Sequence, residues 1–159
     1  MGFAHLHCYT YATPGDGWLH PRELCGIGRR RDVYAVALTD RGSLWKVPEY
    51  VQAANELDVE PIIGCEVQVV AQHGVAEEGH PIVLLVENER GYMNLVKLSS
   101  ATQSGYRANR PLQLATLGQH ADGLIALSGG QQSLVTTLVR DNRHDEAIGA
   151  IAALAAPFG

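Results

Sequence analysis

The stretch from Val33 to Val70 reads VYAVALTDRGSLWKVPEYVQAANELDVEPIIGCEVQVV and decides the fold class. Its two ends, Val33–Thr39 and Pro61–Val70, are compact apolar runs of the kind found in buried strands. Between them, Val47–Leu57 carries apolar residues at helical spacing on one face. A strand, a helix and a second strand in this order predict an α/β fold with a parallel sheet.

The same alternation continues on both sides of this stretch. Further strands are predicted at Phe3–Cys8, Ile82–Val86 and Leu124–Leu127. The other predicted elements are helices at Pro21–Gly26, Asn88–Leu98, Leu112–His120, Gln132–Val139 and Asp145–Ala155, a loop at Tyr11–Trp18 and a polar turn at Gln72–Gly79. The pattern fits a sheet that is open or closed into a barrel. Because the chain ends after a helix, where the next strand would begin, we expect a barrel fragment with an open edge.

Composition and charge narrow the function classes. The 159 residues are 46% hydrophobic and 18% charged, which suits one folded domain. The formal net charge is −5, and the basic run Arg29–Arg31 is expected to close a helix, where cations meet the negative end of the dipole. Any DNA contact is therefore expected from a cleft or from another part of a larger protein. No apolar run could cross a membrane and no signal peptide opens the chain, so we expect a cytoplasmic protein.

Two histidines and three acidic residues fall where α/β barrels carry their chemistry. His5 and His7 lie two apart in a predicted strand, so their imidazoles should project from the same face. Asp16, Asp40 and Glu66 lie in or just after predicted strands, whose carboxyl ends converge on one mouth in a barrel. These donors would bind a divalent metal such as zinc, manganese or iron, which activates water and clamps phosphate. Alternatively, the two aspartates cap turns and Glu66 is merely exposed.

Four motifs, in order and at familiar spacing, resemble the opening of a polymerase-type PHP (polymerase and histidinol phosphatase) domain. They are Phe3–His7, Asp16–Gly17, Ala37–Asp40 and Pro61–Glu66. The next helix and strand of that subgroup are also matched, by Gly91–Leu95 with Leu98–Ser100 and by Gly123–Gly129. The chain therefore resembles the N-terminal PHP domain of the kind that opens the alpha subunit of bacterial DNA polymerase III.

This resemblance implies a TIM-barrel-like, distorted (β/α)7 barrel of the metal-dependent phosphoesterase type. Residues 1–159 would form its N-terminal portion, with the last strands and the final metal motif absent. PHP domains carry a metal cluster at the C-terminal mouth of the barrel. In some replicative polymerases they are 3′–5′ proofreading nucleases, and in others they are inactive structural elements. The parent chain would be a DNA-directed DNA polymerase, which is a nucleotidyltransferase.

The sequence departs from the family pattern at the metal site. Tyr9 and Arg41 stand where the family has histidines, and Gly130 stands where a cysteine is expected. A histidine at the start of the fourth strand is replaced by Pro81, although the adjacent His80 could substitute if the strand slips.

The ligands that remain in the family pattern are His5, His7, Asp16 and Glu66. Arg41 brings a permanent positive charge to the place of a metal, where it could pair with Asp16 or Glu66 and neutralise them instead. Around the four ligands, supporting or charge-replacing roles are assigned to Asp40, Arg41 and His80. We expect efficient catalysis to be lost.

The expected function is a mainly structural or exonuclease-docking PHP domain. Its partners would be the polymerase body of the same parent chain and a proofreading exonuclease subunit, with DNA contacted only through the parent. The alternatives are a free-standing PHP phosphoesterase acting on nucleotide or small phosphate esters and a purely structural interaction module without metal. Trp18 and Trp45, near the mouth in sequence order, are expected to pack rather than to stack a base.

Overall fold

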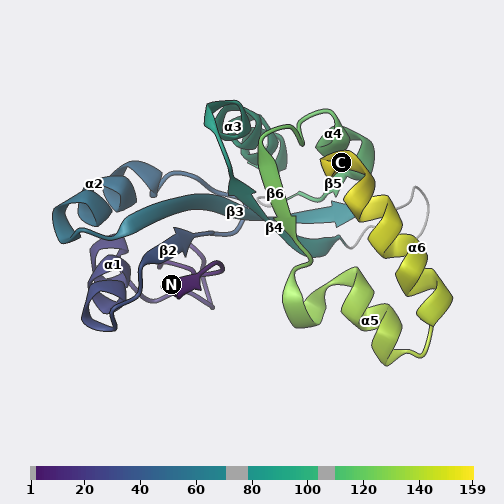
Figure 1. Cartoon of the computed structure of the whole chain (residues 1–159). Coiled ribbons are helices and arrows are strands. Elements are labelled where there is room, and N and C mark those ends of the chain that lie inside the picture. The colour runs from purple at the N-terminus through teal and green to yellow at the C-terminus, as the bar shows by residue number, and fades with distance from the viewer. Residues whose placement is uncertain (1–2, 71–78, 104–109) are drawn as a thin grey trace.

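The computed structural model describes residues 3–70, 79–103 and 110–159. The strands of its six-stranded sheet are β1 (Ala4–His5), β2 (Ala35–Leu38), β3 (Glu60–Val70), β4 (His80–Val86), β5 (Leu112–Gln113) and β6 (Leu124–Leu127). The strand order is β1-β2-β3-β4-β6, and β5 pairs with β3 off this path. Figure 1 shows a sheet that curls around the long strand β3 without closing. The predicted α/β class with an incomplete barrel is confirmed.

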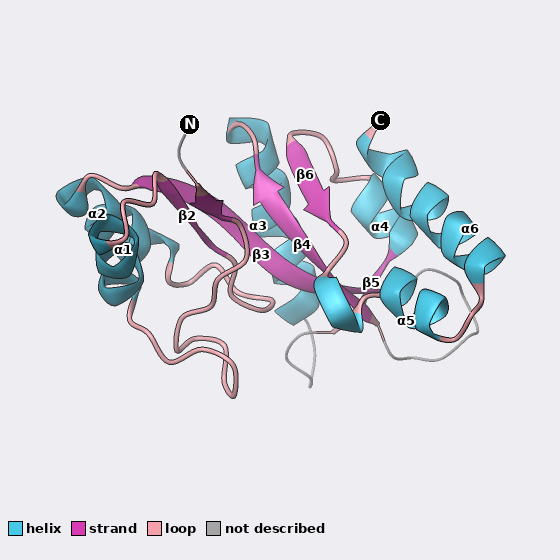
Figure 2. Ribbon diagram, turned by 60° about the horizontal axis from the view of Figure 1, so that its bottom comes forward, coloured by secondary structure: helices cyan, strands magenta, loops and turns pink. Residues whose placement is uncertain are grey.

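Helices flank this sheet at both ends and on one side (Figures 1 and 2). They are α1 (Pro21–Arg30), α2 (Val47–Leu57), α3 (Glu89–Gln103), α4 (Leu114–Gly118), α5 (Leu134–Arg140) and α6 (His144–Ala155), with 3-10 turns η1 (Gly130–Gln132) and η2 (Ala156–Phe158). Within the described ranges, no helix is long and apolar enough to cross a membrane.

The first half of the chain forms the parallel part of the sheet, with α1 and α2 packed beside it (Figure 1). Tyr50 of α2 lies in this core with its ring fully buried, and its hydroxyl donates to the backbone carbonyl of Val36. The bond satisfies the one polar group that the ring carries inside. The boundaries of α2 coincide with the predicted helix. As predicted, the basic run closes α1, because Arg29 and Arg30 form its last turn.

The second half departs from the predicted parallel arrangement, because β4 runs antiparallel to both β3 and β6. Only nine residues, 71–79, separate β3 from β4. A parallel neighbour requires a crossover of about a dozen residues or more, usually a helix, whereas a short connection joins antiparallel strands. Nearly all of the predicted polar turn Gln72–Gly79 lies outside the described residues.

Several predicted element bounds are also corrected. The helix α3 runs to Gln103 rather than to Leu98, and β2 is Ala35–Leu38 rather than Val33–Thr39. The first strand is only Ala4–His5 rather than Phe3–Cys8, and α1 continues four residues past Gly26 to Arg30. The predicted helix Leu112–His120 is divided into β5 and α4, because Leu112 and Gln113 pair with the end of β3. In the last case a tertiary contact overrides the local pattern.

A close backbone approach between α3 and the loop before β6 yields a first prediction. A Cβ atom at Gly91 would lie 1.8 Å from the carbonyl oxygen of Gly123, which already accepts a hydrogen bond from the backbone of Glu87. Because both partners are backbone, neither can rotate away. We expect Gly91→Ala to lower the free energy of unfolding by about 2–3 kcal/mol in urea denaturation.

Gly149 in α6 provides the matched control. A Cβ atom there meets nothing within 4 Å, so Gly149→Ala should raise stability by about 0.5–1 kcal/mol through helix propensity alone. Equal effects of the two substitutions would contradict the close approach at Gly91.

Candidate functional site

The loops that follow β1 and β2 meet the middle of β3 at a cluster of ionised and polar side chains. The backbone nitrogen of Thr39 donates a hydrogen bond to the carbonyl oxygen of Cys8 at 2.9 Å. This bond extends the contact between the two segments beyond the end of β1. Arg41 then forms an isolated parallel bridge with Glu66. These contacts bring residues that are distant in sequence to one side of β3.

Glu66 is the centre of the cluster and is only 2% exposed. Its Oε1 accepts a hydrogen bond from Arg41 Nε at 2.6 Å, and its Oε2 accepts one from the Tyr9 hydroxyl at 2.5 Å. His7 Nε2 lies 3.0 Å from the same Oε2. Because an ionised carboxylate only accepts, Nε2 of His7 carries the hydrogen in this contact. Both oxygens of Glu66 are therefore engaged by donors.

Arg41 joins Glu66 to the second carboxylate of the cluster. Its Nη1 lies 3.0 Å from Asp16 Oδ2, and the centre of its guanidinium lies 5.4 Å from the centroid of the Tyr9 ring. The backbone nitrogen of Arg41 donates to the Thr13 hydroxyl at 3.1 Å. We call the five residues His7, Tyr9, Asp16, Arg41 and Glu66 the Arg41 cluster.

The Arg41 cluster keeps Glu66 ionised. Burial raises the pKa of Glu66, but the hydrogen bonds from His7, Tyr9 and Arg41, with the guanidinium charge, outweigh burial and bring this pKa down from 4.5 to about 2. Burial lowers the pKa of Arg41, and Glu66, Asp16 and Tyr9 more than offset this and raise it. Burial and the Glu66 carboxylate also raise the pKa of Tyr9, so that its hydroxyl remains a neutral donor.

Asp40, predicted to support the site, is buried and anchors the loop beside it. Its Oδ1 accepts hydrogen bonds from the Thr10 backbone at 2.7 Å and the Thr13 hydroxyl at 2.9 Å, and its Oδ2 accepts one from the Thr10 hydroxyl at 2.6 Å. No contact between Asp40 and Glu66 side chains is found among the described residues. Asp40 therefore acts on the cluster by holding the loop that carries Tyr9 and Asp16.

His5 and His80 are not brought into the Arg41 cluster. His5 pairs in register with Val36, which in turn pairs with Pro61, five positions before Glu66 on β3. At the rise of a strand this is roughly 16 Å along the sheet. Among the contacts of the described residues, the His5 ring meets the ring of Phe3 at 4.8 Å.

His80 lies opposite Val69 in the β3–β4 ladder, whereas Glu66 lies opposite Val83. Directly paired residues point to the same face, and residues three apart on a strand point to opposite faces. The side chain of His80 therefore faces away from Glu66, and the register shows no slip. Its Nδ1 lies 3.4 Å from the Gln132 carbonyl.

The residues of the Arg41 cluster do not fit a metal ion in this arrangement. A metal bound to Glu66 would have to compete with the donors from Arg41, Tyr9 and His7, which take three of the roughly four lone-pair positions of the carboxylate, and His7 would have to turn its other ring nitrogen to the ion. It would also stand beside the permanent charge of Arg41. Across residues 3–70, 79–103 and 110–159, no group of three or more His, Cys, Asp or Glu side chains could hold a metal ion.

Some members of the site escaped the sequence analysis. From the sequence, Tyr9 is only a replacement of a histidine expected in the family. In the structure its hydroxyl donates a hydrogen bond to Glu66. Thr10 and Thr13 carry no signal beyond their place in a loop rich in turn residues. The prediction that Trp18 and Trp45 pack inside is wrong, because they are 82% and 68% exposed on loops outside the core.

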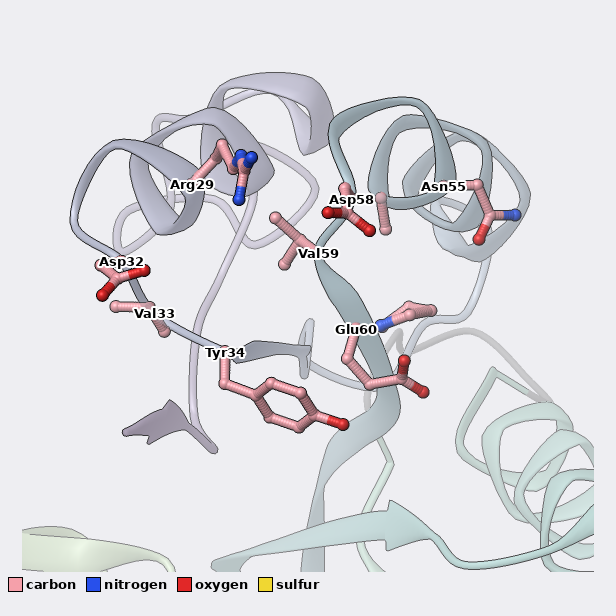
Figure 3. A pocket seen from close by; sticks show the side chains of 10 residues that line it. Arg29, Asp32, Val33, Tyr34, Asn55, Asp58, Val59 and Glu60 are labelled. Atoms are coloured by element: carbon pink, nitrogen blue, oxygen red, sulfur yellow. The ribbon is translucent and has the colours of Figure 1, made fainter. Parts of the chain in front are cut away.

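A separate hollow of about 620 Å³ opens at the amino ends of β2 and β3, between the last turns of α1 and α2. Figure 3 shows Asp32, Asp58 and Glu60 around it, together with Arg29. None of the predicted site residues lines this hollow. It is therefore distinct from the Arg41 cluster.

Comparison with known proteins gives consistent matches along the chain. The DNA polymerase III subunit alpha of Caulobacter vibrioides is 32% identical over the whole chain, and that of Thermus aquaticus is 33% identical over 91% of it. The chain spans only 14% and 13% of the length of these two proteins.

Solved structures also share the fold. One of them is named a metal-dependent phosphoesterase, comes from Bifidobacterium adolescentis, and superposes with a TM-score of 0.51 at 19% identity. The match covers 65% of this chain and 34% of the other. The model of the PHP domain matches residues 5–159. The chain belongs to the PHP domain family.

Proposed function

We propose that the chain is the N-terminal PHP domain of a bacterial DNA polymerase III alpha subunit and that its role there is structural. Two observations support this function. The chain is 32% and 33% identical to two DNA polymerase III alpha subunits over 100% and 91% of its length. The matched region is only 14% and 13% of those much longer proteins. Two of the residues that match the family's metal site, Asp16 and Glu66, are in this chain joined by Arg41.

The Arg41 cluster is the observation that supports a structural rather than a catalytic role. Asp16 and Glu66 supply two negative charges, and the guanidinium of Arg41 lies between them. A divalent ion at the same place would face that guanidinium at short range, where like charges repel by several kcal/mol at an effective dielectric constant of about 20. Arg41 thus takes over the neutralising role that a metal has in an active PHP site. Without a metal to activate water and clamp a phosphate, hydrolysis of phosphoesters loses its main source of rate.

The proposed partners follow from the same reading. The domain would pack on the polymerase body of its own parent chain and offer a docking surface to a proofreading exonuclease subunit. DNA would be contacted only through the parent, in keeping with a net charge of −5. The proposed location is the cytoplasm.

A phosphodiesterase assay with added manganese or zinc tests this function. We expect no release of product from a chromogenic phosphodiester, from a nucleoside monophosphate or from single-stranded DNA above the level of a Glu66→Gln control. Metal-dependent turnover that His7→Ala and Glu66→Gln both abolish would contradict the proposal. It would favour instead a free-standing phosphoesterase acting on nucleotide or small phosphate esters.

A further inference from the structure

The backbone immediately after Arg41 is held from the opposite side of the sheet. The carbonyl oxygen of Gly42 lies 3.0 Å from Ser99 Oγ, 2.8 Å from Gln103 Nε2 and 3.3 Å from Thr102 Oγ1. All three side chains come from the last turns of α3, a helix that packs against β3 through Leu95 and Leu98. None of these side chains belongs to the Arg41 cluster.

Hydrogen-bonding capacity decides which of these three contacts hold the carbonyl. A carbonyl oxygen has two lone pairs, and a threonine hydroxyl has one hydrogen to donate. Thr102 Oγ1 lies closer to the Ser99 carbonyl, at 2.7 Å, so its hydrogen is committed there. Ser99 and Gln103 therefore satisfy the two lone pairs of the Gly42 carbonyl. We call Ser99 and Gln103 the α3 clamp.

The α3 clamp completes a three-sided fixation of the segment that carries Arg41. The backbone nitrogen of Gly42 donates to the Glu66 carbonyl at 2.8 Å, and the backbone nitrogen of Arg41 donates to Thr13 Oγ1 at 3.1 Å. Gly42 has a φ of 64°, a left-handed conformation that turns its carbonyl toward α3. Loop, strand and helix each hold one backbone group of Arg41 or Gly42.

This fixation matters because the guanidinium of Arg41 must meet two carboxylates on different segments at once. Its contacts with Glu66 and Asp16 are 2.6 and 3.0 Å, distances that a shift of one ångström in the backbone would break. The clamp is the contact that ties this position to α3. Gly42 is buried and its bond from Ser99 lies inside the protein, so removal of the Ser99 hydroxyl leaves that lone pair of the carbonyl without a donor.

We propose that Ser99 and Gln103 are positioning residues that set the place of Arg41 between Asp16 and Glu66. The proposal rests on the proposed function in that it takes the Arg41 cluster as the working state of the site. It gives a role to Ser99 of the Leu98–Ser100 segment of α3, which contributes no residue to the Arg41 cluster. It also makes the charge balance of the site dependent on a helix on the other side of β3.

The test is the Nε–H proton signal of Arg41 in a nitrogen-15 NMR spectrum of the chain, identified by its loss in Arg41→Lys. In the unaltered chain we expect slow exchange of this proton with solvent, because it is bonded to a buried carboxylate. Ser99→Ala and Gln103→Ala should each speed this exchange by about tenfold. The double variant should exchange this proton faster than either single variant. Ser99→Thr keeps the hydroxyl and should therefore retain slow exchange.

Ser100→Ala is the matched control, since Ser100 lies on the same helix and its hydroxyl donates to the Val96 carbonyl instead. It should leave the Arg41 signal unchanged. Slow Arg41 exchange that persists in the single variants and in the double variant would overturn the clamp while leaving the Arg41 cluster intact. Fast exchange already in the unaltered chain would overturn the cluster itself, and with it the proposed function.

Discussion

Replacing Arg41 with methionine is expected to lower the free energy of unfolding by about 3 kcal/mol at pH 7. Methionine retains much of the side-chain volume but leaves the buried carboxylate of Glu66 without its counter-charge. An ionised group in that position must then either stay unpaired or take up a proton, and both cost stability. Urea denaturation followed by circular dichroism measures the difference.

The pH dependence of Arg41→Met supplies the control. In the unaltered chain the pKa of Glu66 is depressed from 4.5 to about 2, so its contribution is present above pH 4.5 and is lost as the pH falls toward 2. Without Arg41 the share of that contribution that the guanidinium supplies is missing, while the share from His7 and Tyr9 remains, so the two proteins should approach each other in stability as the pH falls through this window. Adding Glu66→Gln to Arg41→Met should recover part of the loss at pH 7. A variant as stable as the parent at pH 7 would contradict the account.

Asp40→Ala should be the more damaging of the two substitutions, with a loss of about 4 kcal/mol. It removes the acceptor of three buried hydrogen bonds and leaves the donors of Thr10 and Thr13 unsatisfied, at about 1–3 kcal/mol each. Asp40→Asn keeps one acceptor and should lose about half as much. Thermal or urea unfolding of the three proteins measures the order.

Asp122→Ala is a suitable control for Asp40→Ala. Asp122 pairs with Arg90 at 2.6 Å, but the two side chains are 66% and 74% exposed. Solvent screens such a pair, so its loss should change stability far less than the loss of Asp40. Similar effects at Asp40 and Asp122 would show that the Thr10–Asp40 contacts do not hold the loop.

The sequence predicted elements best where a periodic pattern and a buried face coincide. The boundaries of α2 and β6 match the predictions, since apolar spacing alone defines them. The direction of β4 was mispredicted because direction depends on the connection, not on the composition of the strand. The short β1 could not be foreseen, because Phe3–Cys8 has strand-like residues but leaves the ladder after His5.

The candidate site was predictable only in part, for a related reason. Asp16 and Glu66 could be chosen because residues near strand ends converge in this class of fold, and the structure joins both to Arg41. The role of Asp40 could not be read from the sequence. Its three hydrogen bonds depend on the conformation of a loop 27–30 residues earlier, which no period or spacing encodes.

Whether Arg41 replaces a metal is tested most directly by the number of metal ions bound per chain after equilibrium dialysis against zinc or manganese and removal of the unbound ion. We expect far less than one ion per chain, and the same stability in urea with the ion or with a chelator. One or more tightly bound ions per chain, lost in Glu66→Gln and accompanied by higher stability, would show that a metal displaces Arg41 and would contradict the account.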